Sequence, residues 1–146
     1  MHIGRQPSFS VDLKIRDLSL KPVVNSCRDL GILVCGSLSH SSHIANIINV
    51  ASQSSNLILR TFETRDIATL KSAFMTYVRP LLEYNSVVWS PLYISDIRAL
   101  EKVQIRFTKR LPTLQQLPYS RRIEQLGLQS LELCRIINDL VICVTK

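Results

Sequence analysis

Residues 95–112 read SDIRALEKVQIRFTKRLP, and the spacing of their apolar side chains predicts an amphipathic helix over residues 95–111. The apolar residues recur three or four positions apart and share one side of a helical wheel: Ile97, Leu100, Val103, Phe107 and Leu111. The Lys and Arg residues share the opposite side: Arg98, Lys102, Arg106, Lys109 and Arg110. Ser95 is a natural N-cap, and Leu111–Pro112 ends the helix because the residue before a proline avoids the α region. The stretch therefore predicts a helix with one buried face and one cationic face.

Two further helices are predicted before this one. The first covers residues 42–61, with Ser41 or Ser42 as its N-cap and an apolar face made of Ile44, Ile47, Ile48, Ala51, Ile58 and Phe62. The second covers residues 65–84, with Asp66 in its first turn and an apolar face made of Ile67, Leu70, Phe74, Tyr77, Val78, Leu81 and Leu82. Pro80 lies inside this second face, where a proline removes a backbone hydrogen bond and costs about 3 kcal/mol or more in a straight helix. The surroundings of Pro80 must therefore compensate for a kink.

Two shorter helical patterns follow Pro112. Tyr119–Leu126 ends at Gly127, which suits a C-terminal stop, and a last helix runs from Ser130 onward. The apolar face of the last helix consists of Leu131, Cys134, Ile137, Leu140, Val141 and Val144. We interpret Cys134, and also Cys143, as small hydrophobic residues.

The start of the chain has a different period. Apolar and polar residues alternate from Phe9 to Ile15, and the alternation resumes at Leu18 shifted by one residue, as a bend or bulge near Asp17 would cause. Ile32–Cys35 is a further short strand between two glycines. The predicted fold class is therefore α+β and mainly α, with a short antiparallel strand segment followed by a helical bundle.

The composition limits the classes of protein to which the chain can belong. Of its 146 residues, 46% are hydrophobic and 20% are charged, which is the balance of one ordinary globular domain. The four cysteines show no CxxC spacing and we recognise no signal peptide, so we expect an intracellular protein with reduced thiols, in the nucleus or the cytoplasm. The longest apolar stretch is interrupted by Arg79, Glu83 and Asn85, so we expect no membrane partner.

The formal charge of +7 is concentrated toward the C-terminus. From residue 101 to the end, the sequence has eight Lys or Arg against four Asp or Glu. A local excess of basic residues favours a polyanionic partner, usually nucleic acid. The alternative is a solvated helix face, which charge alone does not exclude.

Sequence signatures of enzymes are absent from the chain. It has no GxxxxGK[ST], GxGxxG, GxSxG or HExxH motif, no two adjacent aspartates, and no nucleophile with a base at a recognisable spacing. His40 and His43 could form a zinc site with Cys27 and Cys35, but the spacing matches no familiar structural zinc site. We favour a capping or loop role for the two histidines, and we expect neither a metal nor a cofactor.

Four blocks of sequence, taken in order, resemble one family. They are RDLGILVCGSLSHSSHI at residues 28–44, YVRPLLEYNSVVWSP at 77–91, IRALEKVQIRFTKRLP at 97–112 and LPYSRRIEQLGLQSLELCRIINDL at 117–140. From about residue 24 to residue 139 the chain resembles the C-terminal part of reverse transcriptases from non-LTR retrotransposons, the LINE-type elements of the jockey and chicken-repeat kind. In that family the first block lies where the last strands of the palm meet the thumb, the next two belong to the thumb and its extension, and the fourth follows.

The resemblance implies both an organisation and an absence. It implies a remnant of palm-end strands over residues 1–38, a thumb-like helical region over 39–112 with a helix kinked at Pro80, and a C-terminal helical extension over 113–146. The family's polymerase centre, with its aspartates and the magnesium ions they hold, lies upstream and is not in this sequence, so we expect no enzymatic activity from this chain. One departure is the LELCRIIND segment, where Cys134 precedes Arg135 and the family tends to carry paired arginines.

Two functional hypotheses remain. In the first, the chain is a fragment of a retrotransposon RNA-directed DNA polymerase whose thumb-like region holds an RNA/DNA duplex or hybrid by sequence-independent phosphate contacts. The contacting residues would be Arg98, Lys102, Arg106, Lys109 and Arg110, with Arg121 and Arg122 as secondary candidates, and the missing palm and fingers would be further partners. Trp89 and Tyr84 could stack on bases, but an aromatic residue beside an apolar helix end is more often part of the core. In the second, the chain is a non-functional or protein-interaction remnant of a decayed element.

Overall fold

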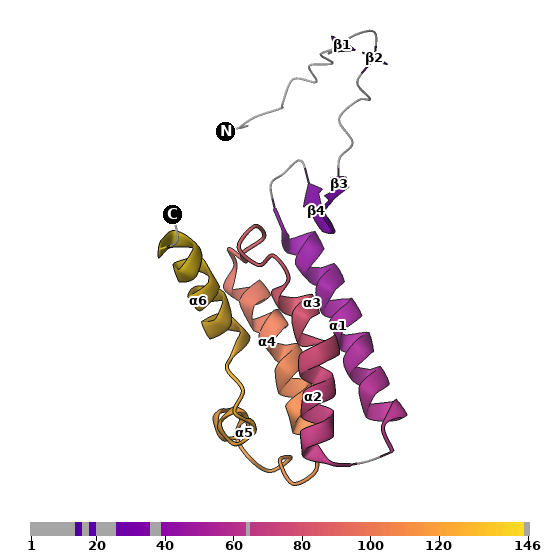
Figure 1. Ribbon diagram of the computed structural model, residues 1–146, viewed down its shortest axis with the longest axis vertical. Helices are drawn as coiled ribbons and strands as arrows, with labels where there is room; N and C mark the ends of the chain where they lie inside the picture. Colours follow the sequence, from indigo (N-terminus) through magenta and orange to yellow (C-terminus); the bar gives the residue numbers. More distant parts are fainter. Residues whose placement is uncertain (1–13, 16–17, 20–25, 36–38, 64, 145–146) are drawn as a thin grey trace, which may run out of the picture.

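The computed structural model describes residues 14–15, 18–19, 26–35, 39–63 and 65–144. The elements of this part of the chain are, in order, β1 (Lys14–Ile15), β2 (Leu18–Ser19), β3 (Ser26–Asp29), β4 (Ile32–Cys35), α1 (Ser41–Thr61), α2 (Ile67–Tyr77), α3 (Arg79–Glu83), α4 (Ile94–Lys109), α5 (Tyr119–Leu126) and α6 (Leu131–Val144). Helix α1, the α2–α3 pair and α4 lie side by side, and both α5 and α6 pack on α4 (Figure 1). The predicted fold class, mainly α with a short antiparallel strand segment, is confirmed.

The strands form two antiparallel pairs, β1 with β2 and β3 with β4, each a sheet of two strands. Strand β4 has the predicted bounds, but its partner β3 reads SCRD and carries no apolar alternation that could have predicted it. The turn between them contains Leu30 and Gly31 with φ values of 45° and 87°, both positive as in a type I′ turn. The alternating stretch before Lys14 and the expected bend near Asp17 lie outside the described residues.

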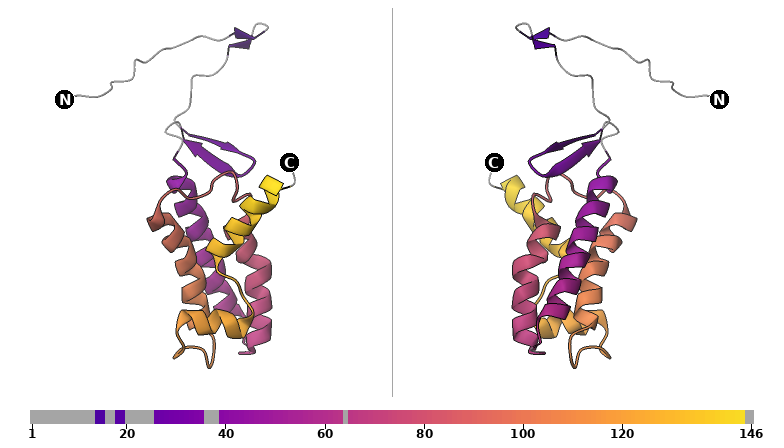
Figure 2. Two further views of the ribbon diagram at one scale, coloured as in Figure 1. Left: turned by 90° about the vertical axis from the view of Figure 1, so that its left-hand side faces the viewer. Right: turned by 90° about the vertical axis from the view of Figure 1, so that its right-hand side faces the viewer.

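The β3–β4 hairpin lies at the end of the bundle where α1 begins (Figure 2). Ile32 is buried there, and the backbone N–H of Leu33 donates to Nδ1 of His43 at 3.3 Å. The ring of His43 is buried edge-on against the indole of Trp89, with the ring centroids 5.6 Å apart. The expected capping or loop role is therefore wrong for His43, which lies inside α1 and attaches the hairpin to it.

The predicted helix caps need correction at two helices. His40, rather than Ser41 or Ser42, occupies the N-cap position of α1, and its side chain makes no capping hydrogen bond. Helix α4 begins at Ile94 after an uncapped Tyr93, so Ser95 is not its N-cap, and it ends at Lys109, two residues before the predicted end. The hydroxyl of Ser41 instead donates to the carboxylate of Asp96 at 2.8 Å and joins the starts of α1 and α4.

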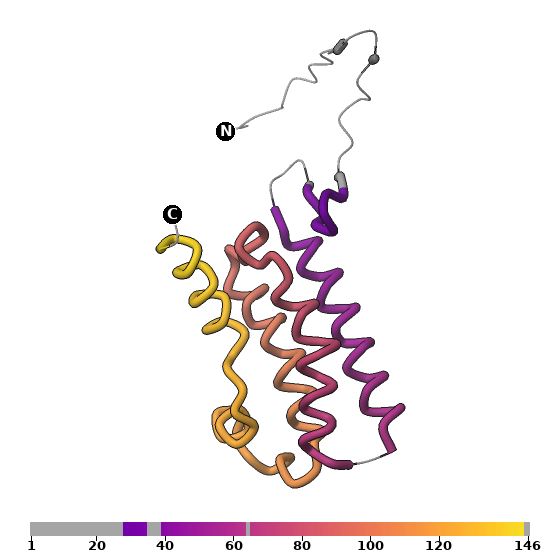
Figure 3. Tube along the Cα trace, in the orientation of Figure 1, coloured from indigo at the N-terminus to yellow at the C-terminus, as the bar shows by residue number. Residues whose placement is uncertain are grey.

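Pro80 does not kink one long helix, because the chain forms two helices at this point. Helix α2 ends at Tyr77, and Pro80 lies in the first turn of α3, where its missing N–H has no intrahelical acceptor to lose. The two helices follow one another along the bundle (Figure 3). Asp66 is the N-cap of α2, accepting from the backbone N–H of Thr69 at 2.9 Å. The prediction of a single helix over residues 65–84 is therefore wrong, because the helix is interrupted at Val78. Pro80 costs no backbone hydrogen bond in the first turn of α3, so no kink has to be compensated.

One hydrophobic core joins all the helices. Phe74 of α2 and Phe107 of α4 stack with their ring centroids 4.3 Å apart, and Ala51 of α1 is fully buried beside them in the same cluster. The core continues into the C-terminal region through Leu114, Leu126, Leu128 and Leu131. Trp89 is in the core as expected, with its Nε1 donating to the carbonyl of Tyr84 at 2.8 Å.

Several residues on the predicted apolar faces are exposed. Tyr77 of α2 points outward, as does Phe62 at the end of α1. The predicted core position of Tyr84 is wrong, since this ring is also exposed. On α6 only Leu131 of the predicted apolar face is buried, whereas Ile137, Leu140, Val141 and Val144 are exposed.

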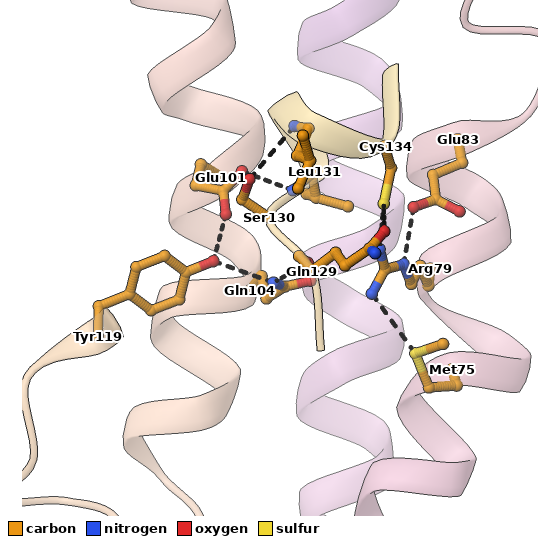
Figure 4. Close-up of polar contacts among 11 residues, drawn as sticks. Met75, Arg79, Glu83, Glu101, Gln104, Tyr119, Gln129, Ser130, Leu131 and Cys134 are labelled. Atoms are coloured by element: carbon orange, nitrogen blue, oxygen red, sulfur yellow. Dashed lines mark hydrogen bonds and ion pairs between the residues drawn. The ribbon is translucent and has the colours of Figure 1, made fainter. Parts of the chain in front are cut away.

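Helix α4 carries a third face that its apolar and cationic residues do not reveal. Nε2 of Gln104 donates to the Tyr119 hydroxyl and to the Gln129 carbonyl, each at 3.0 Å, and Tyr119 in turn donates to Glu101 (Figure 4). The second carboxylate oxygen of Glu101 accepts from the backbone N–H of Leu131, the first residue of α6, at 3.0 Å. Burial, helped by Glu101, raises the pKa of Tyr119, so the phenol remains a donor. This row of hydrogen bonds, formed by Glu101, Gln104, Tyr119 and the backbone N–H of Leu131, holds the beginnings of α5 and α6 against α4.

Replacing Tyr119 with Phe should destabilise the protein by about 1–3 kcal/mol, because Glu101 and Gln104 each lose a partner in a partly buried place. The free energy of unfolding from urea denaturation measures this change. Tyr77→Phe is the matched control, since the Tyr77 ring is exposed, and it should change stability by less than about 0.5 kcal/mol. Equal effects of the two substitutions would contradict a structural role for the row.

Stability should also fall as the pH drops below the ordinary pKa of histidine, about 6.5. Burial lowers the pKa of His43, and His40 and Arg28 act in the same direction. The folded protein therefore binds fewer protons at this ring than the unfolded chain, so the stabilisation is complete above the unfolded pKa and is lost as the pH falls through the lowered folded pKa. A protonated Nδ1 also cannot accept from Leu33.

The measurement is urea denaturation at pH 8 and pH 5 for the unaltered protein and for His43→Gln. The loss of stability between the two pH values should be smaller in the variant, because it lacks the titrating ring. An identical loss in both proteins would show that other groups cause the pH dependence.

Candidate nucleic-acid interface

The five cationic residues of α4 lie on its exposed face. Arg98, Lys102, Arg106, Lys109 and Arg110 are all exposed, and Leu100, Val103 and Phe107 on the opposite side are buried. None of the five forms an ion pair with any residue that the structure describes. Their charges are therefore available to an external anion.

The C-terminal part of this cationic face forms one wall of an open groove. A first basin of about 630 Å³ lies between α1 and α4, which pack side by side (Figure 2). Its α4 wall carries Arg106, Lys109 and Arg110. Its α1 wall carries the short polar side chains of Ser52, Ser55 and Asn56. Three cations thus face short polar side chains across a hollow that Leu59, Val103 and Phe107 also line.

A second basin of about 640 Å³ adjoins the first at the end of α1. The two basins share Asn56, Leu59, Arg110 and Gln115, and Nη1 of Arg110 donates to Oδ1 of Asn56 at 2.6 Å where they meet. Arg60 and Arg65 line the second basin together with one acid, Glu63. We call the two basins together the α1–α4 groove.

The sequence did not indicate Arg60 and Arg65 as candidates. Arg60 lies in the last turn of α1, where a cation suits the negative helix end, and Arg65 lies in the connection to α2. Neither belongs to a basic cluster along the chain. Only the packing of α1 against α4 brings them to Arg110, about fifty residues later in the sequence.

The two secondary candidates on α5 do not extend this surface. Arg122 is only 5% exposed, and its Nη1 donates to the Ile105 carbonyl at 3.0 Å and to the Thr108 hydroxyl at 3.1 Å. Its guanidinium also lies over the Tyr119 ring, 5.6 Å from the centroid. Arg122 therefore attaches α5 to α4. Its predicted role as a phosphate contact is wrong, because its guanidinium is buried and bonded within the protein. Arg121 is exposed and pairs with Glu124 at 3.0 Å on its own helix.

The proposed base-stacking residues lie elsewhere. Trp89 is fully buried beside His43. Tyr84 is exposed, but it lies near the turn of the β3–β4 hairpin, close to Gly31, and does not line either basin. The aromatic ring that lines the second basin is Phe62.

Cys134 is neither a plain hydrophobic residue nor an activated nucleophile. Its Sγ lies 2.7 Å from Nη2 of Arg79, which also pairs with Glu83 at 2.7 Å (Figure 4). Burial raises the pKa of the Cys134 thiol although Arg79 acts in the opposite direction, so the thiol form is favoured. The interpretation of Cys134 as a small hydrophobic residue is therefore wrong, because it is a polar partner of Arg79. Cys143 is exposed, so it also does not pack as one.

Two further kinds of feature were sought among the described residues, a metal-binding cluster and a membrane-spanning helix. Among them no three His, Cys, Asp or Glu side chains cluster in a way that could hold a metal ion, and the side chains of Cys27 and Cys35 are outside the description. No helix in the described part of the chain is both long enough and apolar enough to cross a membrane.

Comparison of the chain with family models, with curated proteins and with solved structures finds no match.

Proposed function

We propose that the chain binds the phosphate backbone of a nucleic acid, without reading its sequence, through the cationic face of α4 and the α1–α4 groove. The observation that carries this proposal is the convergence of Arg106, Lys109 and Arg110 with Arg60 and Arg65 around one open groove. Two neighbouring cations, Arg98 and Lys102, continue the same face of α4. An extended polyanion can contact all of them at once, whereas a small anion cannot.

The chemistry of the groove suits phosphate more than base edges. Arg and Lys side chains neutralise phosphates and release condensed counterions, which gives affinity that does not depend on sequence. Polar groups on the α1 wall, such as Asn56, can add hydrogen bonds to phosphate or sugar oxygens.

We further propose that this binding belongs to the thumb-like region of a non-LTR retrotransposon reverse transcriptase. Support comes from the four sequence blocks in order, and the helical bundle after a short strand segment is compatible with it. In this proposal the chain lacks the catalytic centre, holds a primer–template duplex or hybrid, and acts inside the cell, in the nucleus or the cytoplasm. The palm and fingers of the parent polymerase would be its protein partners.

Replacing Arg106 and Lys109 together with Gln should weaken duplex binding and flatten its salt dependence. Each lost phosphate contact removes about one unit from the slope of log affinity against log salt concentration, so the slope should fall by up to about two. Gln has a helix propensity close to that of Lys and Arg, so α4 should remain folded. The measurement is the duplex dissociation constant across a salt series, for two unrelated duplex sequences.

Arg28→Gln with Arg121→Gln is the charge-matched control. Both residues are exposed and neither lines the groove, so this variant has the same net charge as the groove variant. Its slope should equal that of the unaltered protein. An equal change in both variants would mean that net charge alone, and no defined surface, attracts the nucleic acid.

The chain should incorporate no nucleotides when it is supplied with magnesium, primer–template and nucleoside triphosphates. Phosphoryl transfer by this family depends on metal-holding aspartates, and this sequence has no adjacent aspartate pair. A primer-extension assay with the purified protein measures this. Extension that persists after contaminating polymerases have been excluded would overturn the assignment as a non-enzyme.

A protein-interaction remnant is the second candidate function, and helix α6 favours it. Ile136, Ile137, Leu140, Val141 and Val144 of this helix are all exposed large hydrophobic residues. A contiguous exposed apolar surface is typical of a protein contact. An unchanged salt slope in the groove variant would favour this candidate over nucleic-acid binding.

A further inference from the structure

The second basin places an exposed aromatic ring beside arginines. Its lining combines an apolar part, formed by Leu59, Phe62 and Leu70, with the guanidinium groups of Arg60, Arg65 and Arg110. The first basin is also partly apolar, through Leu59, Val103 and Phe107, but Phe107 is buried in the core, whereas Phe62 of the second basin is exposed. A ligand that fills the second basin must therefore present both an apolar surface and negative charge.

Phe62 is the aromatic residue that lines this basin, and it is partly exposed. It is the C-cap of α1, its backbone N–H donates to the Ile58 carbonyl at 3.1 Å, and its φ and ψ of −81° and 108° turn the chain out of the helix. The helix end thus fixes the backbone of Phe62, while 37% of the residue remains exposed beside arginines. A partly exposed aromatic ring next to cations is the arrangement that single-stranded nucleic-acid sites use to stack bases.

We infer that the second basin binds one unpaired nucleotide, with its base stacked on Phe62 and its phosphates on Arg60, Arg65 and Arg110. The inference rests on the proposed function, because the backbone of the same strand would continue into the first basin past the Arg110–Asn56 hydrogen bond. A base inside a duplex has both faces stacked on its neighbours, so an unpaired nucleotide, unlike an internal base pair, can offer a face to Phe62. The groove then distinguishes a duplex with a single-stranded extension from a blunt duplex.

Other anions fit the basin less well. An acidic peptide would bring carboxylates to the arginines, but it offers no flat surface to the ring unless it also carries an aromatic residue. A free phosphate would satisfy the arginines and leave the exposed part of Phe62 in contact with water. A nucleotide satisfies both parts, since every base has a π-face and every linkage has a charge.

The test compares a blunt duplex with the same duplex carrying one unpaired 2-aminopurine nucleotide, in DNA and in RNA versions and at each strand end in turn. The unaltered protein should bind at least one overhang version more tightly than the blunt duplex and should quench its 2-aminopurine fluorescence on stacking. Phe62→Leu should lose about fivefold or more of the overhang affinity, because stacking on an aromatic ring is worth about 1–3 kcal/mol per base. Its affinity for the blunt duplex should not change.

Two further variants make the result specific to the ring of Phe62. Phe62→Tyr keeps an aromatic ring and should retain the overhang preference, and Tyr77→Leu removes an exposed aromatic residue that lines neither basin and should behave as the unaltered protein. Urea denaturation shows whether each variant is folded. Equal affinities of Phe62→Leu and the unaltered protein for every overhang would overturn the inference.

The two proposals fail in different ways. An overhang preference that depends on Phe62, found together with an unchanged salt slope in the Arg106–Lys109 variant, would remove the proposed backbone contact and leave the nucleotide site. A flattened slope without any overhang preference would remove only the nucleotide site. A protein that binds none of these nucleic acids would remove both.

Discussion

The hydrogen-bonded row on α4, formed by Glu101 and Gln104 with Tyr119 of α5 and the first N–H of α6, is the constraint on which the rest of the structure depends. A buried amide or carboxylate without its partner costs about 1–3 kcal/mol, so alternative packings of α5 and α6 on α4 are disfavoured. Because of this row, α5 and α6 cover a second face of α4, in addition to the face that packs into the core. The cationic face of α4 is the one that remains exposed to water. The availability of the basic surface is therefore a consequence of how the C-terminal helices are held.

The shape of the groove depends on a segment of α1 whose residues have low helix propensity. Residues 52–56 read SQSSN in the interior of a helix of 21 residues, although Ser and Asn are weaker helix formers than Ala or Leu. Their short side chains leave a hollow opposite the long cationic side chains of α4. Larger side chains such as Leu at these positions would favour the helix and fill the first basin. Residues whose conformational preference disagrees with the structure they adopt are expected mainly at functional sites. In this protein such residues line the groove.

Sequence periodicity predicted most of the apolar residues that α1, the α2–α3 pair and α4 bury, but not those of α6, and not which distant residue each helix contacts. It placed the helices α1, α4 and α5, the stop at Gly127 and both main faces of α4, because these follow from local spacing and backbone preference. It failed for Arg122, which resembles its exposed neighbour Arg121 in sequence but lies within reach of a carbonyl of α4. It also failed for Phe62, whose position suits an apolar face although the helix ends there. Arg60 and Arg65 joined the candidate site only through packing, which no single stretch of sequence encodes.

The like charges gathered at the groove act against folding and are compatible with the proposed polyanionic ligand. Five cations, Arg60, Arg65, Arg106, Lys109 and Arg110, line its two basins, and Glu63 is the acid that lines them. Like charges gathered in this way repel one another, and placing Lys109 at the negative end of α4 offsets only about 0.3–1 kcal/mol of that cost. A chain selected for stability alone would pair such residues with acids, as Arg79 is paired with Glu83. In the proposed function, a bound polyanion would remove this repulsion and release its own counterions, so one surface would both cost stability in the free protein and supply affinity in the complex.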